Sequence, residues 1–316
     1  MTLHNSSPPQ VSIGIPVYGA SRKLFFALQA CLASSSTNYS IRTIYIVNSG
    51  PSFDLPACYS INNSNIAFVV KDVPHNYFWS RSVACIYALF KNDASSHLLL
   101  LNHDCYPSIS CFDTLVGAHK RLGDNSVCHS VLIDHVTSEV WWSGTYLPPL
   151  SRQRFIVSKS DCLDSDTPPI STSSTMGQCL LIPDAAVNIS FLHCNHLPHY
   201  FADSVQTSEM RRNGFNLYVI PQSVAFVDQS DQLDKVQWLS TRSLNDLSKV
   251  FFHPKSSRNI KAVFYSTLFH RDSFFAGIIC AIYEVLGKIL ITLIELVANV
   301  SNIPVIRNFT TLKRLG

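Results

Sequence analysis

The residues with the clearest chemical potential follow a run of four leucines. The segment Leu98–Asp104, LLLLNHD, ends in a polar tip that carries an amide and a carboxylate. A continuous apolar run of this length is typical of a strand buried on both faces of an α/β sheet, and ligands bind beyond the carboxyl ends of such strands. Asn102 and Asp104 offer oxygen ligands that suit a hard divalent cation, which could in turn bind phosphates. The alternative is a simple turn, because Asp, Tyr-Pro and Ser all favour turns.

A second group of ligand-type side chains is less convincing. His193, Cys194, His196 and His199 lie close together in the chain and could be drawn as a zinc site. Zinc sites of this kind normally have two halves with matching ligand spacing, and no second half is evident here. We therefore expect no zinc at this segment.

Composition excludes several classes of protein. The chain has 316 residues, of which 47% are hydrophobic and 14% charged, and its formal net charge is +3. So few charges give no basic face for nucleic acid, and so many apolar residues exclude a disordered chain. The length is ample for a large core in one or two domains.

The ten cysteines point to a reducing compartment. They are scattered without a CxxC pair, and the first ten residues show neither a charged nor an apolar region of the kind found in signal peptides. The sequence predicts a cytoplasmic protein.

Strand and helix patterns alternate along the chain. Strands are expected at Val11–Val17, Ile41–Val47, Ile66–Val70, Leu98–Leu101, Leu180–Ile182 and Leu217–Ile220, and helices at Leu24–Leu32, Ser80–Phe90 and Ser204–Asn213. This alternation implies βαβ units and a mostly parallel sheet flanked by helices. Residues 151–174 are rich in Ser, Asp, Thr and Pro and are expected to form a long surface loop or a mobile lid.

The pattern changes near residue 230. We expect residues 1–230 to form the α/β domain and residues 231–316 to form a helical extension. Within the extension, residues 274–300 form long apolar runs, and the polar residues among them fall on one helical stripe. These are Glu284, Lys288, Thr292, Glu295 and Asn299. A helix lying in a membrane interface and an ordinary core helix both fit this stripe, whereas charges at a bilayer centre would be costly to a spanning helix.

Five segments together resemble one enzyme family. In chain order they are VSIGIPVYG, IYIVNSG, LLLLNHD, MGQCLLIP and LPHYFADSVQTSEMRRNGFNLYVIP. Their order and spacing resemble the inverting family 2 glycosyltransferases, in particular a rhamnosyltransferase-like subgroup of glycan biosynthesis. The resemblance covers residues 10 to 230. It implies the GT-A fold, a nucleotide-diphospho-sugar transferase fold related to the Rossmann type.

The resemblance implies roles for residues that would hold the donor nucleotide. The turn Pro16-Val17-Tyr18 resembles the family's segment against the nucleotide, and Asn48 stands where an acidic or amide residue holds the base. Ser80 and Arg81 fall in the region that runs along the donor's diphosphate and sugar. A serine at this place could also cap a helix, whose free N–H groups would meet an anion.

Three acidic residues receive the catalytic roles that the resemblance implies. Asp104 matches the metal-binding carboxylate of the family's Asx-x-Asp tip, with Asn102 beside it and Mg²⁺ or Mn²⁺ as the metal. Asp228 lies near a strand end where relatives carry a further metal ligand. Asp203 matches the base that deprotonates the acceptor, and it lies eleven residues before Gly214, as expected of a residue that opens a helix. A helix N-cap is the alternative for Asp203.

The predicted function is therefore transfer of a sugar, with inversion, from a nucleotide-diphosphate donor to a hydroxyl of a saccharide or lipid-linked acceptor. Peripheral contact with the inner membrane face is expected through the last helix. The alternative is a non-catalytic member of this fold that binds sugar nucleotide or a partner. It is motivated by Asn48, Asn102 and Val205, which stand where many relatives carry acids.

Overall fold

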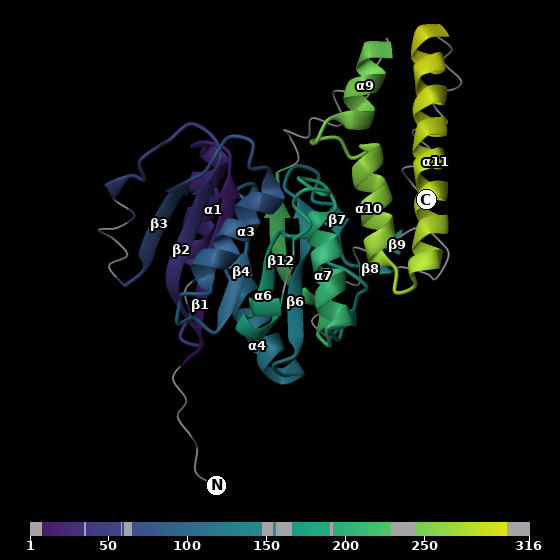
Figure 1. Cartoon of the computed structure of the whole chain (residues 1–316). Helices are drawn as coiled ribbons and strands as arrows, with labels where there is room; N and C mark the ends of the chain where they lie inside the picture. Colours follow the sequence, from purple (N-terminus) through teal and green to yellow (C-terminus); the bar gives the residue numbers. More distant parts are fainter. Residues whose placement is uncertain are drawn as a thin grey trace. The chain divides into compact units, whose positions relative to one another are not determined.

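The computed structural model describes residues 8–34, 36–57, 59, 65–146, 154–155, 166–189, 192–228 and 244–301 (Figure 1). The chain divides into two compact units. The first comprises Met1–Pro148, Arg152–His193 and Asp203–Gln229, and the second comprises Pro149–Ser151, Cys194–Ala202 and Ser230–Gly316.

The first unit is built on one large sheet, which contains ten of the strands in the described part of the chain. They are β1 (Gln10–Val17), β2 (Ser40–Asn48), β3 (Ala67–Asp72), β4 (His97–Leu100), β5 (Cys105–Pro107), β6 (Ser126–Asp134), β7 (Val140–Trp142), β10 (Ile170–Ser171), β11 (Leu180–Pro183) and β12 (Asn216–Val227). The main order is β10-β12-β6-β11-β4-β1-β2-β3, with β5 paired to β12 and β7 paired to β6. A separate pair joins β8 (Thr145–Tyr146) to β9 (Arg154–Phe155).

Six of the ten strands take part in parallel pairs. β1, β2, β3 and β4 run in one direction, and β12 runs parallel to β6. β11 lies antiparallel between β4 and β6. The apolar runs of β1 and β4 are buried along almost their whole length, as strands covered on both faces require. The expected mixed, mostly parallel α/β sheet is confirmed.

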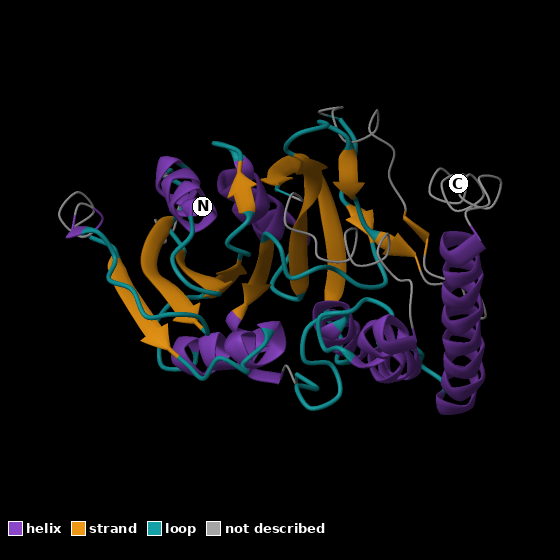
Figure 2. Cartoon of the chain, turned by 90° about the horizontal axis from the view of Figure 1, so that it is seen from above, coloured by secondary structure: helices purple, strands orange, loops and turns teal. Residues whose placement is uncertain are grey.

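Helices cover both faces of this sheet (Figure 2). They are α1 (Arg22–Ala33), α3 (Trp79–Phe90), α4 (Cys111–Leu122), α6 (Asp184–Ile189) and α7 (Ala202–Arg212). Side chains of α1 and α4 share one apolar core with Ile13 and Ile15 of β1. Gly14, between these two, faces the other side, where a Cβ would overlap Ile86 of α3. The alternation of β1 thus places one helix layer on each face.

Cysteine thiols gather in the core beneath α4. The sulfur atoms of Cys111 and Cys179 lie 3.4 Å apart, and Ser130 and Ser223 place their hydroxyls 3.2 and 3.3 Å from Cys111. Burial raises the pKa of Cys111 and of Cys179 well above the ordinary thiol value. These thiols are therefore protonated, and every cysteine in the described part of the chain is free of disulfides.

The described part of the second unit between residues 244 and 301 is mainly helical, in agreement with the expected helical extension. It contains α9 (Leu244–Phe252), α10 (Ile260–His270) and α11 (Phe274–Ser301). Asn259 caps α10 by accepting a hydrogen bond from the Ala262 backbone N–H at 3.0 Å. α10 and α11 pack side by side, since Leu268 of α10 comes within 3.0 Å of the position that a Cβ on Gly277 would take.

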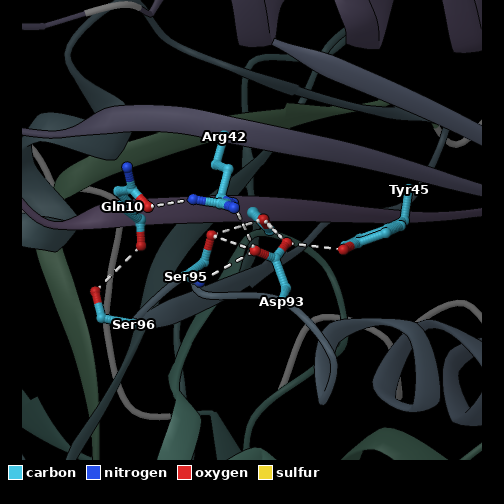
Figure 3. A network of polar contacts seen from close by, with 7 residues as sticks. Gln10, Arg42, Tyr45, Asp93, Ser95 and Ser96 are labelled. Carbon is cyan, nitrogen blue, oxygen red and sulfur yellow. Dashed lines mark hydrogen bonds and ion pairs between the residues drawn. The ribbon is translucent and has the colours of Figure 1, made fainter.

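A buried carboxylate joins β1 and β2 to the loop before β4 (Figure 3). Asp93, in the loop between α3 and β4, accepts hydrogen bonds from Ser12 at 2.6 Å and from Tyr45 at 2.7 Å. The Ser95 backbone N–H donates at 3.1 Å, and Arg42 lies 3.0 Å away. The Asp93 side chain is only 2% exposed. One carboxylate thus joins β1, β2 and the start of β4 at the end of the sheet opposite the LLLLNHD tip.

We predict that Asp93→Asn destabilises the protein by about 1–3 kcal/mol, because a charged acceptor of several hydrogen bonds is lost. Burial alone would raise the pKa of Asp93, but the hydrogen bonds from Ser12, Tyr45 and Ser95 outweigh it and lower the pKa. A lowered folded-state pKa stabilises the protein above the ordinary aspartate pKa of about 3.9, and this stabilisation disappears as the pH falls through the folded-state value. The difference between wild type and variant should therefore shrink in acid.

Urea denaturation of both proteins at neutral and acidic pH measures this difference. Asp54→Asn is the matched control, because Asp54 is exposed. A loss of stability equal to that of the control would contradict the role given to Asp93.

Candidate active site

The carboxyl ends of β1, β2 and β4 meet at one edge of the sheet. Because these strands are parallel and adjacent, the residues that follow them become neighbours. Tyr18 follows β1, Asn48 ends β2 and Asn102 follows β4. The parallel pairing thus brings these three positions to one edge of the sheet.

Asn48 organises the loops at this edge. Its Oδ1 accepts hydrogen bonds from the backbone N–H groups of Gly19 at 2.8 Å and Gly50 at 2.9 Å. Its Nδ2 donates to Asp72 at 2.6 Å and to the Pro51 carbonyl at 3.0 Å. Asn48 is completely buried, so its amide joins the turns after β1 and β2 to the end of β3. A contact of this amide with a base stays a prediction.

Two exposed rings, those of Tyr18 and His75, lie in the loops after β1 and β3. Pro16 and Val17 are buried within β1, whereas Tyr18 is 58% exposed. Its ring lies 6.4 Å from that of His75, whose Nδ1 is 2.9 Å from the Ser49 carbonyl oxygen. Asp72 is also exposed here, and hydrogen bonds from Ser52 and Asn48 lower its pKa. Sequence reasoning missed Asp72, which ends β3 as Asn48 ends β2.

The start of α3 differs from the expectation in one respect. The expected Ser80 cap is wrong, because the helix begins at Trp79 and Phe78 occupies the N-cap position without a side-chain hydrogen bond. Ser80 is completely buried in the first turn instead. The Arg81 guanidinium lies over the Tyr77 ring, 5.6 Å from its centroid.

Asp104 and Asp228 are brought together by a strand pair. β5 begins immediately after Asp104 and runs antiparallel to the end of β12, with Val227 opposite Cys105. The Asp228 backbone N–H donates to the Asp104 carbonyl oxygen at 2.9 Å. Lys23 of α1 forms an ion pair with the Asp228 carboxylate at 3.2 Å. Asp104 and Asp228, which are far apart in the sequence, are therefore neighbours in the fold.

The environment of Asp104 suits a cation. Burial raises the pKa of its carboxyl, His103 and Lys23 oppose this shift, and the Asp228 carboxylate adds to it. Its Oδ1 is buried and has no hydrogen-bond partner among the described residues. A divalent metal would satisfy this oxygen and relieve the repulsion between the carboxylates.

Protein ligands alone would not complete a metal site here. Within the described ranges, no group of three or more His, Cys, Asp and Glu side chains could hold a metal, and this includes the described members of the His193–His199 segment. Mg²⁺ and Mn²⁺ suit such a partial set of oxygen ligands, since Mg²⁺ is usually bound through one or two carboxylates together with water and substrate phosphates.

Asp203 is held by the backbone at the start of α7. Its Oδ2 accepts a hydrogen bond from the Gly177 N–H at 2.9 Å, and its Oδ1 accepts one from the Ser204 N–H at 2.8 Å. Burial nevertheless raises the pKa of this carboxyl, which the two hydrogen bonds only partly oppose. α7 ends as expected, with Gly214 at φ +94° after Arg212. Asp203 is the second residue of the helix and not its N-cap.

Trp79 connects the two acidic halves of the site. Its Nε1 donates to Asn102 Oδ1 at 2.8 Å, two residues before Asp104. Its ring lies against the Gly177 backbone so closely that a Cβ there would overlap it. Gly177 in turn donates to Asp203. This chain of contacts was not foreseen from the sequence, although Gly177 lies in a segment that carries the family resemblance and Trp79 directly precedes Ser80.

Trp141 and Trp142, two adjacent aromatic residues of β7, have a mainly structural role. Trp142 is 4% exposed and donates to Thr145 Oγ1 at 3.2 Å, whereas Trp141 is half-buried and packs at the edge of the core. Adjacent strand residues face opposite sides, which agrees with the different burial of the two rings.

Comparison with known proteins identifies the architecture. No protein-family model matches the chain, and no curated protein matches it by sequence. A crystal structure of GalNAc-T7 with UDP, GalNAc and Mn²⁺ matches 90% of this chain with a TM-score of 0.58 at 9% identity. A structure of S. aureus TarS 1-349 matches 90% of each chain with a TM-score of 0.51 at 11% identity. The chain has the GT-A glycosyltransferase fold.

The matched structures differ in how much of their own length this chain covers. The chain spans 58% of the GalNAc-T7 chain and 54% of a longer TarS structure, for which the TM-score is 0.51 and the identity 12%. At such identities the likeness establishes the GT-A fold alone. The carboxyl edge of the sheet, with Asp104, Asp203 and Asp228 around it, is where an α/β fold of this kind places its ligand.

We predict that Gly177 and Trp79 are energetically coupled. Gly177→Ala should destabilise the protein by about 1–3 kcal/mol, because the added methyl group overlaps the indole. In a Trp79→Ala background the indole is absent, and the same Gly177→Ala change should have little effect. Urea denaturation of the two single variants and the double variant gives the coupling free energy. Additive effects would show that the ring does not constrain this backbone.

Proposed function

We propose that this protein is an inverting, divalent-metal-assisted glycosyltransferase. It would transfer a sugar, such as a hexose, from a nucleotide-diphosphate donor to a hydroxyl of a saccharide or lipid-linked saccharide. The observation that carries the proposal is the chain of contacts Asn102–Trp79–Gly177–Asp203, which connects the segment of the candidate metal carboxylate Asp104 to the candidate base Asp203. The solved GalNAc-T7 structure, with UDP, GalNAc and Mn²⁺, supports this class of donor and metal.

The acceptor would be activated by Asp203. Its carboxylate would take the proton of the acceptor hydroxyl, and the acceptor oxygen would form a bond to the anomeric carbon from the face opposite the leaving group. The bond between that carbon and the diphosphate would break, and its electron pair would leave with the nucleoside diphosphate. The Gly177 and Ser204 N–H groups hold the carboxylate in a fixed orientation for this transfer.

The leaving group would be stabilised on the other side of the site. Asp104 and Asp228 would hold Mg²⁺ or Mn²⁺, with Asn102 beside them. When bound, the metal would neutralise the negative charge that grows on the diphosphate. Lys23, already paired with Asp228, adds a positive charge at this position.

The donor nucleotide would lie against the turns after β1 and β2. Pro16, Val17 and Tyr18 would form one side of its site, Asn48 would face the base, and Ser80 and Arg81 would lie toward the diphosphate and sugar. The burial of Asn48 and the exposure of Tyr18 favour a contact in which the tyrosine ring reaches the ligand directly. We place the enzyme in the cytoplasm, at the inner face of the membrane where lipid-linked acceptors are found.

We predict that Asp203→Asn lowers kcat by about 10²–10⁴-fold, because a general base is lost, while donor binding is retained. Since burial raises the pKa of Asp203, wild-type activity should fall in acid at a pH above the ordinary aspartate range. Activity is present when the carboxyl is deprotonated and is lost as the pH falls through its raised pKa. Transfer assays with a panel of nucleotide sugars and Mn²⁺ across pH test this.

Asp184→Asn is the matched control for Asp203→Asn. Asp184 also stands in the first turn of a helix, α6, but it is exposed. Full activity of the Asp203→Asn variant would refute the base assignment.

We predict that Asp104→Asn removes the metal dependence of donor binding. Wild-type protein should show a rise in Tm with Mn²⁺ and a nucleotide-sugar donor together, because ligands that bind the native state stabilise it. The variant should lose most of this rise, whereas Asp184→Asn should keep it. An unchanged rise in the variant would place the metal elsewhere.

A non-catalytic sugar-nucleotide-binding protein is the second candidate. It is favoured by one observation: both oxygens of Asp203 already accept backbone N–H groups. Donor binding without transfer or donor hydrolysis under all tested conditions would support this candidate, and turnover with any donor would eliminate it.

A further inference from the structure

The polarity of α11 is inverted relative to a helix of a water-soluble protein. Its exposed positions are large and apolar, with exposures between 43% for Leu293 and 79% for Phe275. They are Phe274, Phe275, Ile279, Ile282, Tyr283, Leu286, Leu290, Leu293, Ile294 and Val297. At 3.6 residues per turn, all of these except Phe274 fall on one face about 120° wide.

The polar stripe lies on the opposite side of α11, against the rest of the second unit. Thr292 is 1% exposed, and its hydroxyl accepts a hydrogen bond from Arg258 at 2.8 Å. Glu284 and Lys288 are half-buried on the same side. α10 also packs here, where Gly277 and the fully buried Ala281 allow close approach. The polar residues therefore face protein, and the apolar residues face outward.

The residues beside the apolar face bear on what kind of surface could cover it. A second copy packed as a coiled coil would be accompanied by charged residues beside the seam, which form ion pairs between helices. The positions that flank this face are uncharged instead: Ile278, Val285 and Ile289 on one side, and Cys280, Gly287 and Ile291 on the other. No charge interrupts it between Phe274 and Val297, a length of about 35 Å at 1.5 Å per residue. Such a face fits hydrocarbon.

Two orientations in a bilayer are conceivable. Phe274–Ile294 is long and apolar enough to cross a membrane, with a mean hydropathy of 2.0. A crossing helix would place Glu284, Lys288 and their neighbour Arg258 at the depth of the acyl chains, where charges are strongly disfavoured. A helix in the membrane plane leaves all three above the acyl chains and immerses only the apolar face.

We propose that α11 lies in the plane of the membrane surface, with the face from Phe275 to Val297 inserted among lipid acyl chains and the Glu284–Thr292 side turned to α10. This attachment does not depend on the transfer reaction.

Vesicle flotation of the full chain tests the proposal. Wild-type protein should float with vesicles of phosphatidylcholine and phosphatidylglycerol. Leu286→Glu and Leu290→Glu should each weaken the association roughly tenfold or more, because each removes a large buried apolar side chain from the lipid and adds a charge. Ile109→Glu is the matched control, since Ile109 is an exposed apolar residue of the first unit at 77% exposure.

Circular dichroism and thermal melting show that each variant is folded, as expected for exposed positions. Size-exclusion chromatography with light scattering, in the absence of lipid, measures the oligomeric state. The proposal is overturned if the wild type fails to float, or if the α11 variants float as the wild type does. It is also overturned if wild-type protein forms a dimer that Leu286→Glu dissociates while flotation is unchanged.

Discussion

One close contact determines the geometry of the candidate active site: the indole of Trp79 on the backbone of Gly177. Only a residue without a side chain permits this approach. It leaves the Gly177 N–H directed at Asp203, while the Nε1 of the same indole is directed at Asn102. A rigid aromatic ring therefore sets the separation between the two segments that carry Asp104 and Asp203. A shift of the Gly177 segment would therefore displace the Trp79 ring, and with it the Asn102 segment, because the ring and the glycine backbone are in close contact.

The long strand β12 performs a second positioning task. Its register with β6 shifts between Ile220 and Val224, so the strand continues beyond the irregularity and pairs with β5 on its other side. Because β12 continues, Asp228 lies beside Asp104 and forms an ion pair with Lys23. A strand that stopped at Ile220 would leave Asp104 without this neighbour. The candidate metal position thus depends on strand pairing, whereas the position of Asp203 depends on side-chain packing.

The sequence allowed the sheet and its carboxyl edge to be predicted, because the apolar runs of β1, β2 and β4 are buried on both faces and leave an unmistakable pattern. The second half of β12 was missed, since Pro221, Gln222 and Ser223 read locally as a turn. The Ser80 cap was wrong because packing of α3, and not capping preference, fixes where that helix begins. Spacing placed the polar residues of α11 on one stripe, but spacing alone cannot tell which side of a helix meets protein.

The buried thiols have a practical consequence for the behaviour of the whole molecule. Cys31, Cys105, Cys111, Cys128 and Cys179 all lie in the core, and burial raises the pKa of Cys128 to about 12. A thiol reacts as its thiolate, so these five are inert while the fold is intact and become reactive when it opens. The rate at which an alkylating reagent consumes these five thiols therefore reports the opening of the sheet from within.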